Sequence, residues 1–424
     1  MTADATGRIA QLDVFFGDEY VGSLHDTSPL SFEYSTQWLN RREPATVAFI
    51  PLAAARNDSV AVAAFFENLL PEGELRSYIT ATKKASTLFA LLLEVAGDTA
   101  GGFVILPAGQ RPEAPSYEPT SWEAMGKFLS QKSAAAIDIK SGGKTRISLA
   151  GAQDKASIAI FEDGVPQLPR GTSPSTHILK PDIRRLAKVW HSAANEAIIM
   201  LTAAQCGLPT AEVFYEPHTQ SCVVKRFDRL TQPDGTLARL IQYDLCQLSG
   251  TVSEKKYEKE GGPGVAQCVQ LIRQYSSAPA VDLKNLVSWL FFNLYTGNND
   301  SHAKNLSVCQ VPGSGVRLTP FYDLMCTRLY PGLSQEFALA IGGEVMPGAI
   351  TQAHVRQMAK EMGIGPAFAL SIADDMAKQI PDAIAAATES VQPILSSGAQ
   401  PLALRLQRFV LQTTKQTAKR ILAS

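Results

Sequence analysis

The first fifty residues contain short apolar runs of the length expected for β-strands. Residues 12 to 16 and 20 to 24 are two such runs, and Gly17-Asp18 between them is a turn sequence, so we predict a hairpin. Residues 45 to 50 form a third candidate strand. The chain therefore opens with a β-rich segment.

Helical spacing of apolar side chains follows. It predicts a helix that begins near Val60 and is ended by Pro71, and a second helix over residues 87 to 95. Glycine and proline are then frequent from residue 107 to residue 120. Because both residue types interrupt regular structure, we interpret residues 109 to 120 as a linker or long surface loop.

Strands and one helix alternate after this linker. The helix has a well-formed stop signal, because Gly207 and Pro209 follow its last residues. The predicted elements are, in chain order, two strands around a small-residue turn between 147 and 161, a strand at 176–180, a helix at 195–206, and strands at 213–215 and 222–224.

The pattern from about residue 239 onward is mostly helical. One helix covers residues 283 to 296 and ends at Gly297, and several more are predicted from residue 353 to the end. A chain of 424 residues is long enough for two or three domains. We predict an α+β fold divided into an N-terminal α+β subdomain (1–108), the linker (109–120), a β-rich lobe (121–229) and a helical lobe (230–424).

Composition and charge narrow the class of protein. Hydrophobic residues make up 45% and charged residues 19% of the chain, which is typical of a folded protein rather than a disordered one. The formal net charge is -1, so the chain is not built to coat nucleic acid by bulk charge. A local basic patch, or a partner that binds DNA, is compatible with this value.

The pattern of cysteines and the sequence of the N-terminus favour a reducing compartment of the cell. The six cysteines form no C-x-x-C pair and no zinc-like spacing with histidine, so we interpret them as small buried apolar residues in a reducing environment. The first twenty residues are acidic and hold no apolar run typical of a signal peptide. No stretch reaches about 18 apolar residues, the length that spans a membrane. We expect a cytoplasmic protein.

The strongest chemical signal lies between residues 298 and 323. A polar loop follows the helix that ends at Gly297, and an apolar strand follows the loop. Asp300 and Asn305 stand five residues apart in this loop, which is the D-x-x-x-x-N spacing of protein kinase catalytic loops. Asp323 supplies a second carboxylate after the next strand. Phosphoryl transfer needs these groups, one carboxylate for the acceptor hydroxyl and an amide with a carboxylate for Mg²⁺.

Weaker signals lie upstream. Ser141-Gly142-Gly143 and the small residues from 150 to 152 would let backbone N–H groups approach phosphate, although no Walker A sequence is present. Lys180 ends a strand, as the lysine that meets the α- and β-phosphates does in kinases, and Glu196 on the next helix could orient it. Residues 223 to 229 would join the two lobes and meet adenine through their backbone. An ordinary strand and charged turn would explain that segment equally well.

Together these residues resemble the HipA family of toxin kinases. The resembling segments are residues 147–155, 177–181, 224–229, 299–305 and 318–323, with residues 66–71 of the N-terminal part, and they occur in the same order. The resemblance covers nearly the whole chain. It implies a protein-kinase-like fold with a β-rich N-lobe, a helical C-lobe and an added N-terminal α+β subdomain, and the activity of an ATP- and Mg²⁺-dependent serine/threonine-protein kinase.

The resemblance also implies roles for particular residues. Asp300 would be the catalytic base, and Asn305 and Asp323 would be the Mg²⁺ ligands. Ser148 matches the serine that family members autophosphorylate. A phosphate there would add about -1.5 to -2 charge inside the loop expected to wrap ATP, so we expect loop ejection and self-inactivation. The residues implied to contact ATP are Ala150, Gly151, Ala152, Gln153, Asp154, Lys155, Lys180, Lys225, Arg226, Phe227, His302, Ala303, Lys304, Asn305, Tyr322 and Asp323.

Partners follow from the same resemblance. It implies a toxin–antitoxin pair with a small helix-turn-helix repressor similar to HipB, and binding of operator DNA by the complex. The implied protein substrates belong to translation, among the aminoacyl-tRNA synthetases. One departure concerns Lys225, which stands where the best-known pattern has an acid. Backbone pairing with adenine would survive this difference, whereas a side-chain contact at this position does not follow from the resemblance.

Two other classes of function use the same residues. A small-molecule phosphotransferase of kinase-like fold would share Asp300, Asn305 and Asp323 and differ in its acceptor groove. A catalytically silent module would act only by binding an antitoxin and DNA, but it would have no chemical need for these three residues or for Lys180.

Overall fold

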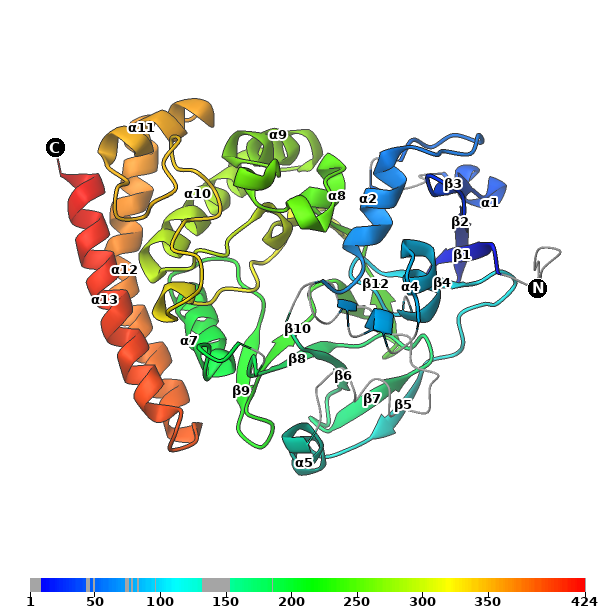
Figure 1. Cartoon of the computed structure of the whole chain (residues 1–424), viewed down its shortest axis with the longest axis horizontal. Helices are drawn as coiled ribbons and strands as arrows, with labels where there is room; N and C mark the ends of the chain where they lie inside the picture. The colour runs from blue at the N-terminus through cyan, green and yellow to red at the C-terminus, as the bar shows by residue number, and fades with distance from the viewer. Residues whose placement is uncertain are drawn as a thin grey trace. The chain divides into compact units, whose positions relative to one another are not determined.

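The computed structural model describes two compact units (Figure 1). The first consists of Met1–Leu179 and Arg226–Glu254, and the second of Lys180–Lys225 and Lys255–Ser424. The residues that the structure describes are 9–42, 46–48, 50–72, 76–77, 79–81, 84–95, 97–131, 153–184 and 186–423.

An antiparallel sheet begins the first unit, with the strand order β3-β2-β1-β4. The predicted hairpin is confirmed, because β1 and β2 pair from Gln11 opposite His25 to Phe16 opposite Glu19. Three helices pack beside this sheet, and the ring of Phe65 meets that of Phe103 edge to face with centroids 5.8 Å apart. The elements are β1 (Gln11–Phe16), β2 (Glu19–His25), β3 (Ser31–Tyr34), α1 (Thr36–Leu39), α2 (Val60–Asn68), α4 (Leu88–Val95) and β4 (Phe103–Pro107).

The predicted strand at residues 45 to 50 is wrong. Within the described part of this segment, Val47 and Ile50 form an isolated bridge with each other, and Ala48 has a φ of 47°. A left-handed residue between two bridged neighbours reverses the chain, which is incompatible with an extended strand. The predicted helices are confirmed as α2 and α4.

A second sheet in the first unit contains β5, β7, β6 and β8 as successive neighbours. Its edge strand β5 lies in the stretch predicted as a linker, where Ser116 pairs with Arg170. An edge strand tolerates proline, and this is how Pro119 fits. The elements are β5 (Ser116–Pro119), α5 (Trp122–Gln131), β6 (Ala156–Ile160), β7 (Pro166–Arg170), β8 (His177–Pro181), β11 (Arg229–Thr231), β12 (Leu237–Arg239), β13 (Gln242–Asp244) and α8 (Leu245–Ser249).

The second unit is built from two segments of the chain. The first begins at the end of β8, and the second begins at the end of the 3-10 helix η1 (Ser253–Lys255). Long helices dominate it, and α12 and α13 run side by side in Figure 1. The elements are α7 (Ser192–Gln205), β9 (Val213–Glu216), β10 (Ser221–Lys225), η2 (Glu258–Glu260), α9 (Val265–Tyr275), α10 (Pro279–Thr296), η3 (Ala303–Asn305), β14 (Ser307–Val311), β15 (Gly315–Leu318), η4 (Thr327–Leu329), α11 (Gln352–Glu361), α12 (Pro366–Val391), η5 (Gln392–Ile394) and α13 (Gln400–Leu422).

Helix α10 is the central helix of this unit's core. Its side chains Trp289, Leu290 and Phe291 are fully buried, which explains its almost continuous apolar sequence. The helix ends at Gly297 as predicted, with a φ of 77° at the cap. All six cysteines are buried and free, as the sequence indicated. None of the helices in the described ranges combines the length and apolar character needed to cross a membrane.

Candidate active site

The loop from Asn298 to Asn305 is fixed at its first two residues. The Asn298 side chain donates to Asn293 Oδ1 of α10 at 2.8 Å, and the backbone N–H of Asn299 donates to Thr327 Oγ1 at 2.8 Å. Gly297 adopts the left-handed conformation that lets the chain leave the buried helix for this loop. The start of the loop is therefore attached to the end of the buried core helix α10.

Asp300 presents its carboxylate from this loop. Half of its side chain is exposed, at 51%. The amide of Asn305 donates through Nδ2 to the Asp300 backbone carbonyl at 3.0 Å, so the two residues five apart are held together. Two further side chains face the carboxylate: the Tyr257 hydroxyl donates to Oδ1 at 2.5 Å, and His302 Nε2 lies 3.9 Å from the same oxygen.

A buried lysine bridges two carboxylates in the same unit. Lys180 at the end of β8 donates to Glu196 Oε1 of α7 at 2.6 Å and also pairs with Asp323 Oδ1. The side chains of Lys180 and Glu196 are 5% and 3% exposed. Burial by itself would lower the pKa of Lys180, but the charges of Asp323 and Glu196 outweigh it and raise that pKa. Lys180 is therefore a fixed positive charge beside Asp323.

Asp323 adopts an unusual backbone conformation. Its φ is 56°, in the left-handed region that residues other than glycine rarely occupy. The conformation turns the carboxylate to Lys180, and 37% of the side chain is exposed. Backbone strain of this kind persists only where the surroundings enforce it, and such positions concentrate at functional sites.

Polar contacts connect the loop from Asn298 to Asn305 with the Asp323 segment. The Tyr322 hydroxyl donates to the Lys304 backbone carbonyl at 3.0 Å and lies 2.7 Å from Ser307 Oγ. Farther along, Asn195 of α7 and Cys326 exchange two hydrogen bonds, of 3.0 and 2.9 Å. The second unit thus brings together the predicted residues Lys180, Glu196, Asp300, His302, Ala303, Lys304, Asn305, Tyr322 and Asp323.

The donor set fits a magnesium ion. Because Nδ2 of Asn305 donates to a carbonyl, its Oδ1 is turned to the opposite side of the amide and can act as an acceptor. Asp323 adds a partly exposed carboxylate. Mg²⁺ prefers such oxygen ligands and is often held by one or two protein groups together with phosphates. In the described ranges, no cluster of three or more His, Cys, Asp or Glu residues could form an all-protein metal cage.

The predicted adenine segment is less open than the sequence indicated. The backbone N–H of Lys225 donates to the Glu212 carbonyl at 2.8 Å, and that of Arg226 donates to the Thr176 carbonyl at 2.8 Å. These two amides are therefore engaged within the protein, and adenine would have to meet other backbone groups of the segment. The Lys225 side chain is exposed and pairs with Glu212 at 2.9 Å. Phe227 is partly buried.

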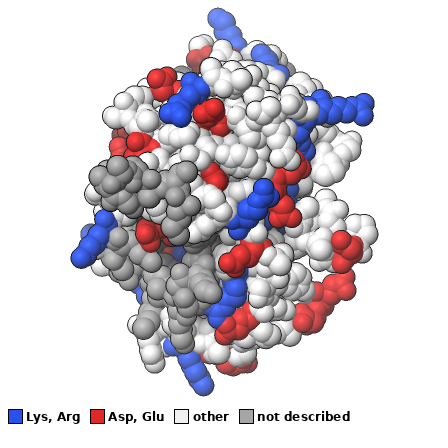
Figure 2. All heavy atoms as spheres, turned by 90° about the vertical axis from the view of Figure 1, so that its right-hand side faces the viewer, with Lys and Arg blue, Asp and Glu red and all other residues white. Residues whose placement is uncertain are grey.

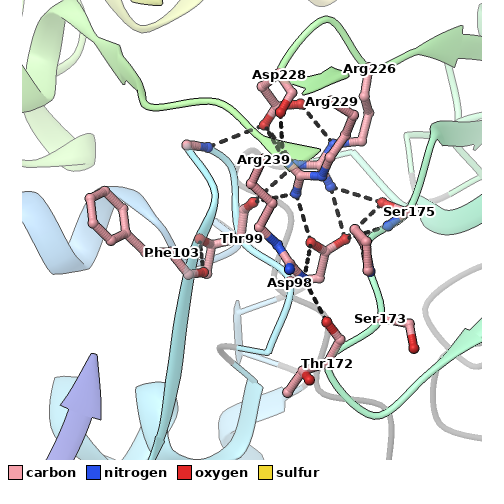
Figure 3. Close-up of polar contacts among 12 residues, drawn as sticks. Asp98, Thr99, Phe103, Thr172, Ser173, Ser175, Arg226, Asp228, Arg229 and Arg239 are labelled. Carbon is pink, nitrogen blue, oxygen red and sulfur yellow. Dashed lines mark hydrogen bonds and ion pairs between the residues drawn. The ribbon is translucent and has the colours of Figure 1, made fainter. Parts of the chain in front are cut away.

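The Arg226 side chain belongs to a buried charge network in the first unit (Figure 3). It reaches Asp98 Oδ2 at 3.1 Å and Asp228 Oδ2 at 2.8 Å. Arg229 contacts the same two carboxylates at 2.7 and 2.9 Å, and Arg239 lies 3.5 Å from Asp98. The network fastens the segment after β10 to the loop before β4, so the Arg226 side chain has a structural partner rather than a ligand.

The remaining predicted residues divide into two groups. Gln153, Asp154 and Lys155 lie just before β6 in the first unit, where Lys155 is buried. Ser148, Ala150, Gly151 and Ala152 lie outside the residues that the structure describes.

Sequence reasoning missed Tyr257 and Asp98. Tyr257 is 43 positions from Asp300, and Asp98 is 128 from Arg226. No local pattern links such residues. The run of glycines after Tyr257 was the one visible signal, because it predicts a tight turn at that point.

Comparisons with known proteins show the family of the chain. The family model described as the HipA-like C-terminal domain matches residues 147–384, more than half of the chain, and the model of the HipA N-terminal domain matches residues 12–106. The serine/threonine-protein kinase toxin HipA of Shewanella oneidensis MR-1 is 29% identical over 409 residues, which are 92% of this chain and 92% of that protein. The Sinorhizobium fredii protein Y4mE, whose name assigns it to the kinases, is 35% identical over 369 residues, 84% of this chain and 86% of that one.

A solved structure has a similar fold. The complex of HipA, HipB and operator DNA from Shewanella oneidensis MR-1 contains a chain that matches with a TM-score of 0.82 at 26% identity, over 97% of this chain and 98% of that chain. This match confirms the predicted fold class, an α+β kinase-like fold with an added N-terminal sheet subdomain. The family model, which covers more than half of the sequence, confirms the resemblance. The chain therefore belongs to the HipA family and is a kinase of that family.

Proposed function

We propose that this kinase transfers the γ-phosphate of ATP to a serine or threonine hydroxyl of a protein. The observation that carries the proposal is the Lys180 bridge, in which one buried ammonium is fixed between Glu196 and Asp323. Phosphoryl transfer depends mainly on positioning and on stabilising charge, and a permanently charged lysine beside a metal-binding carboxylate supplies both.

Asp300 has the exposure that the base requires. Its carboxylate is half exposed, so an acceptor hydroxyl can approach and donate its proton. Asn305 and Asp323 would hold Mg²⁺, which neutralises phosphate charge when it is bound. Lys180 would meet the phosphates, and the stretch from Ala150 to Lys155 would cover them. His302, Ala303, Lys304, Tyr322 and the segment from Lys225 to Phe227 complete the proposed ATP contacts.

We propose further that Ser148 is autophosphorylated. Its neighbours from Ala150 to Ala152 belong to the segment expected to wrap ATP, and a phosphate brings about -1.5 to -2 charge at neutral pH. That charge would repel the phosphates of ATP. Modification of Ser148 would therefore switch the kinase off.

The proposed biological setting is a type II toxin–antitoxin module. The Shewanella structure contains HipA together with HipB and operator DNA. We propose that this chain likewise acts with a HipB-like helix-turn-helix antitoxin, which supplies most of the DNA contact. Support comes from the net charge of -1 and from the face in Figure 2, where basic and acidic side chains are interspersed over the described residues. The proposed protein substrate is a translation component such as an aminoacyl-tRNA synthetase.

The proposed domain division is the one that the sequence predicts. It consists of the N-terminal subdomain (1–108), the linker (109–120), the N-lobe (121–229) and the C-lobe (230–424). Limited proteolysis would test it, because exposed linkers between domains are cut first; the cut is expected before Ser116, where the paired strand β5 begins.

The test of the proposed function is phosphopeptide mapping after incubation with ATP and Mg²⁺. We expect one phosphate on Ser148 in the wild-type chain and none in Ser148→Ala, which should remain active longer on a protein acceptor. The same assay should include sugar and aminoglycoside acceptors. Transfer to those small molecules without any phosphoprotein would support a small-molecule phosphotransferase instead, and ATP binding without any transfer would support a silent binding module.

A further inference from the structure

Tyr257 is brought to the catalytic loop by a rigid turn. The N–H groups of Glu260 and Gly262 both donate to the Tyr257 carbonyl, each at 3.0 Å. The turn has no room for a side chain at Gly262, because a Cβ there would lie 2.1 Å from the Lys255 carbonyl oxygen. Glycine is therefore required for this backbone path.

Two contacts anchor the same turn to residues 336 to 340. Glu258 Oε2 accepts from the Ala340 N–H at 2.7 Å, and Lys259 pairs with Glu336 at 2.9 Å. The first anchor is half-buried, whereas the Lys259–Glu336 pair is exposed and adds little stability. The position of Tyr257 thus depends on backbone hydrogen bonds and on Glu258 rather than on a mobile side-chain pair.

The Tyr257 side chain contacts two residues of the loop from Asn298 to Asn305. Its hydroxyl lies 2.5 Å from Asp300 Oδ1, and its ring meets that of His302 edge to face, with centroids 5.1 Å apart. In the described ranges, the other carboxylate oxygen of Asp300, Oδ2, has no hydrogen-bond partner. One oxygen of this half-exposed carboxylate is therefore held by a donor, and the other is not.

We infer that Tyr257 is a positioning residue for the transfer reaction. Its hydroxyl holds Oδ1 of Asp300 so that Oδ2 points to the acceptor hydroxyl. A half-exposed aspartate without such a donor would sample several rotamers, and only some of them would align with an acceptor. The inference rests on the proposed function, in which Asp300 is the base, and adds a residue that orients it.

The test compares Tyr257→Phe with a matched control in the full chain. Phenylalanine keeps the ring that packs on His302 and removes only the hydroxyl. Tyr275→Phe makes the same chemical change at the end of α9, where the hydroxyl has no hydrogen-bond partner within the described residues. ADP formation should be followed with and without dephosphorylated casein as a serine-containing acceptor.

We expect Tyr257→Phe to lower kcat about tenfold or more, the effect of losing one hydrogen bond to a charged group, with the KM for ATP unchanged. Tyr275→Phe should match the wild type. In an Asp300→Asn background, Tyr257→Phe should have no further effect on the rate. An increase in kcat would overturn the inference, because it would mean that Tyr257 blocks the acceptor position. An equal loss of rate in the wild-type and Asp300→Asn backgrounds would also overturn it, because Tyr257 would then act independently of Asp300.

The outcomes separate this inference from the proposed function. ADP formation without phosphorylated protein would refute the protein acceptor, while Tyr257 would still be judged on the rate of ADP formation. A chain that forms no ADP would refute the proposed function. In that case the Tyr257–Asp300 contact is judged by a double-mutant cycle on unfolding, where additive effects of Tyr257→Phe and Asp300→Asn would overturn it.

Discussion

Replacing Asp98 by asparagine should destabilise the first unit strongly. The Asp98 side chain is fully buried and accepts hydrogen bonds from the backbone and hydroxyl of Ser175, at 3.0 and 2.8 Å. It also contacts Arg226 and Arg229 (Figure 3). Burial alone would raise the pKa of Asp98, but the charges of the surrounding arginines outweigh it and hold that pKa well below its usual range.

The magnitude follows from the charges that remain. Asparagine has the same size but carries no charge, and its NH₂ group would face donors where a carboxylate oxygen now accepts. Among the described residues, Arg226 and Arg229 would then share the single carboxylate of Asp228, and Arg239 would lose the carboxylate it pairs with. Removing one partner of a buried ion pair costs about 3–5 kcal/mol, so we expect Asp98→Asn to lower the free energy of unfolding by about 3 kcal/mol or more.

Urea unfolding followed by circular dichroism measures this loss. The control is Asp18→Asn, an exposed aspartate in the turn between β1 and β2. A second variant adds Arg239→Gln, because burial outweighs the charge of Asp98 and lowers the pKa of Arg239 even in the wild type. The double variant should recover part of the loss. If Asp98→Asn costs no more than Asp18→Asn, the network does not stabilise the unit and the reasoning fails.

Three further predictions concern acid stability, the α10 cap and the lysine bridge. Burial would raise the pKa of Asp228, but the charges of Arg226 and Arg229 outweigh it and hold that pKa at about 2. The ionised carboxylate therefore stabilises the fold by about 2 kcal/mol above pH ~4, and this stabilisation is lost as the pH falls through about 2. A plot of Tm against pH should show the loss, and the Asp228→Asn variant should show a flatter curve. Gly297→Ala should cost about 1–2 kcal/mol in thermal unfolding, because φ is 77° and a Cβ would lie 3.1 Å from Phe409; an unchanged Tm would contradict the cap argument. Glu196→Gln should raise the KM for ATP roughly tenfold, since Lys180 loses a charged partner at 2.6 Å, whereas the exposed Asp374→Asn should leave it unchanged.

Local patterns in the sequence predicted the local structure well. The β1–β2 hairpin and the helices α7 and α10 carry both a period and an end signal within a few residues, and each was found. The Pro-rich stretch was harder to interpret, because the strand β5 depends on its partner β7 and not on its own composition.

The site residues also divide into those that a local pattern predicts and those that depend on distant partners. The spacing of Asp300 and Asn305 is local, and the structure joins them by a hydrogen bond of 3.0 Å. Lys180 and Asp323 are far apart in sequence; each was predicted from its position at or after the end of a strand, but no local pattern could show that their side chains form an ion pair. The Tyr257–Asp300 contact could not be predicted, because a single tyrosine before a glycine-rich turn says nothing about the surface it will meet.

Asp300, on the loop after α10, is proposed above as the base of a phosphoryl transfer reaction. The most direct test is the intact mass of the chain after incubation with ATP and Mg²⁺, for the wild type and for Asp300→Asn, with ATP affinity measured in parallel. We expect a gain of about 80 Da, one phosphate group, in the wild type, and none in Asp300→Asn despite similar ATP binding. An equal mass gain in both chains would contradict it.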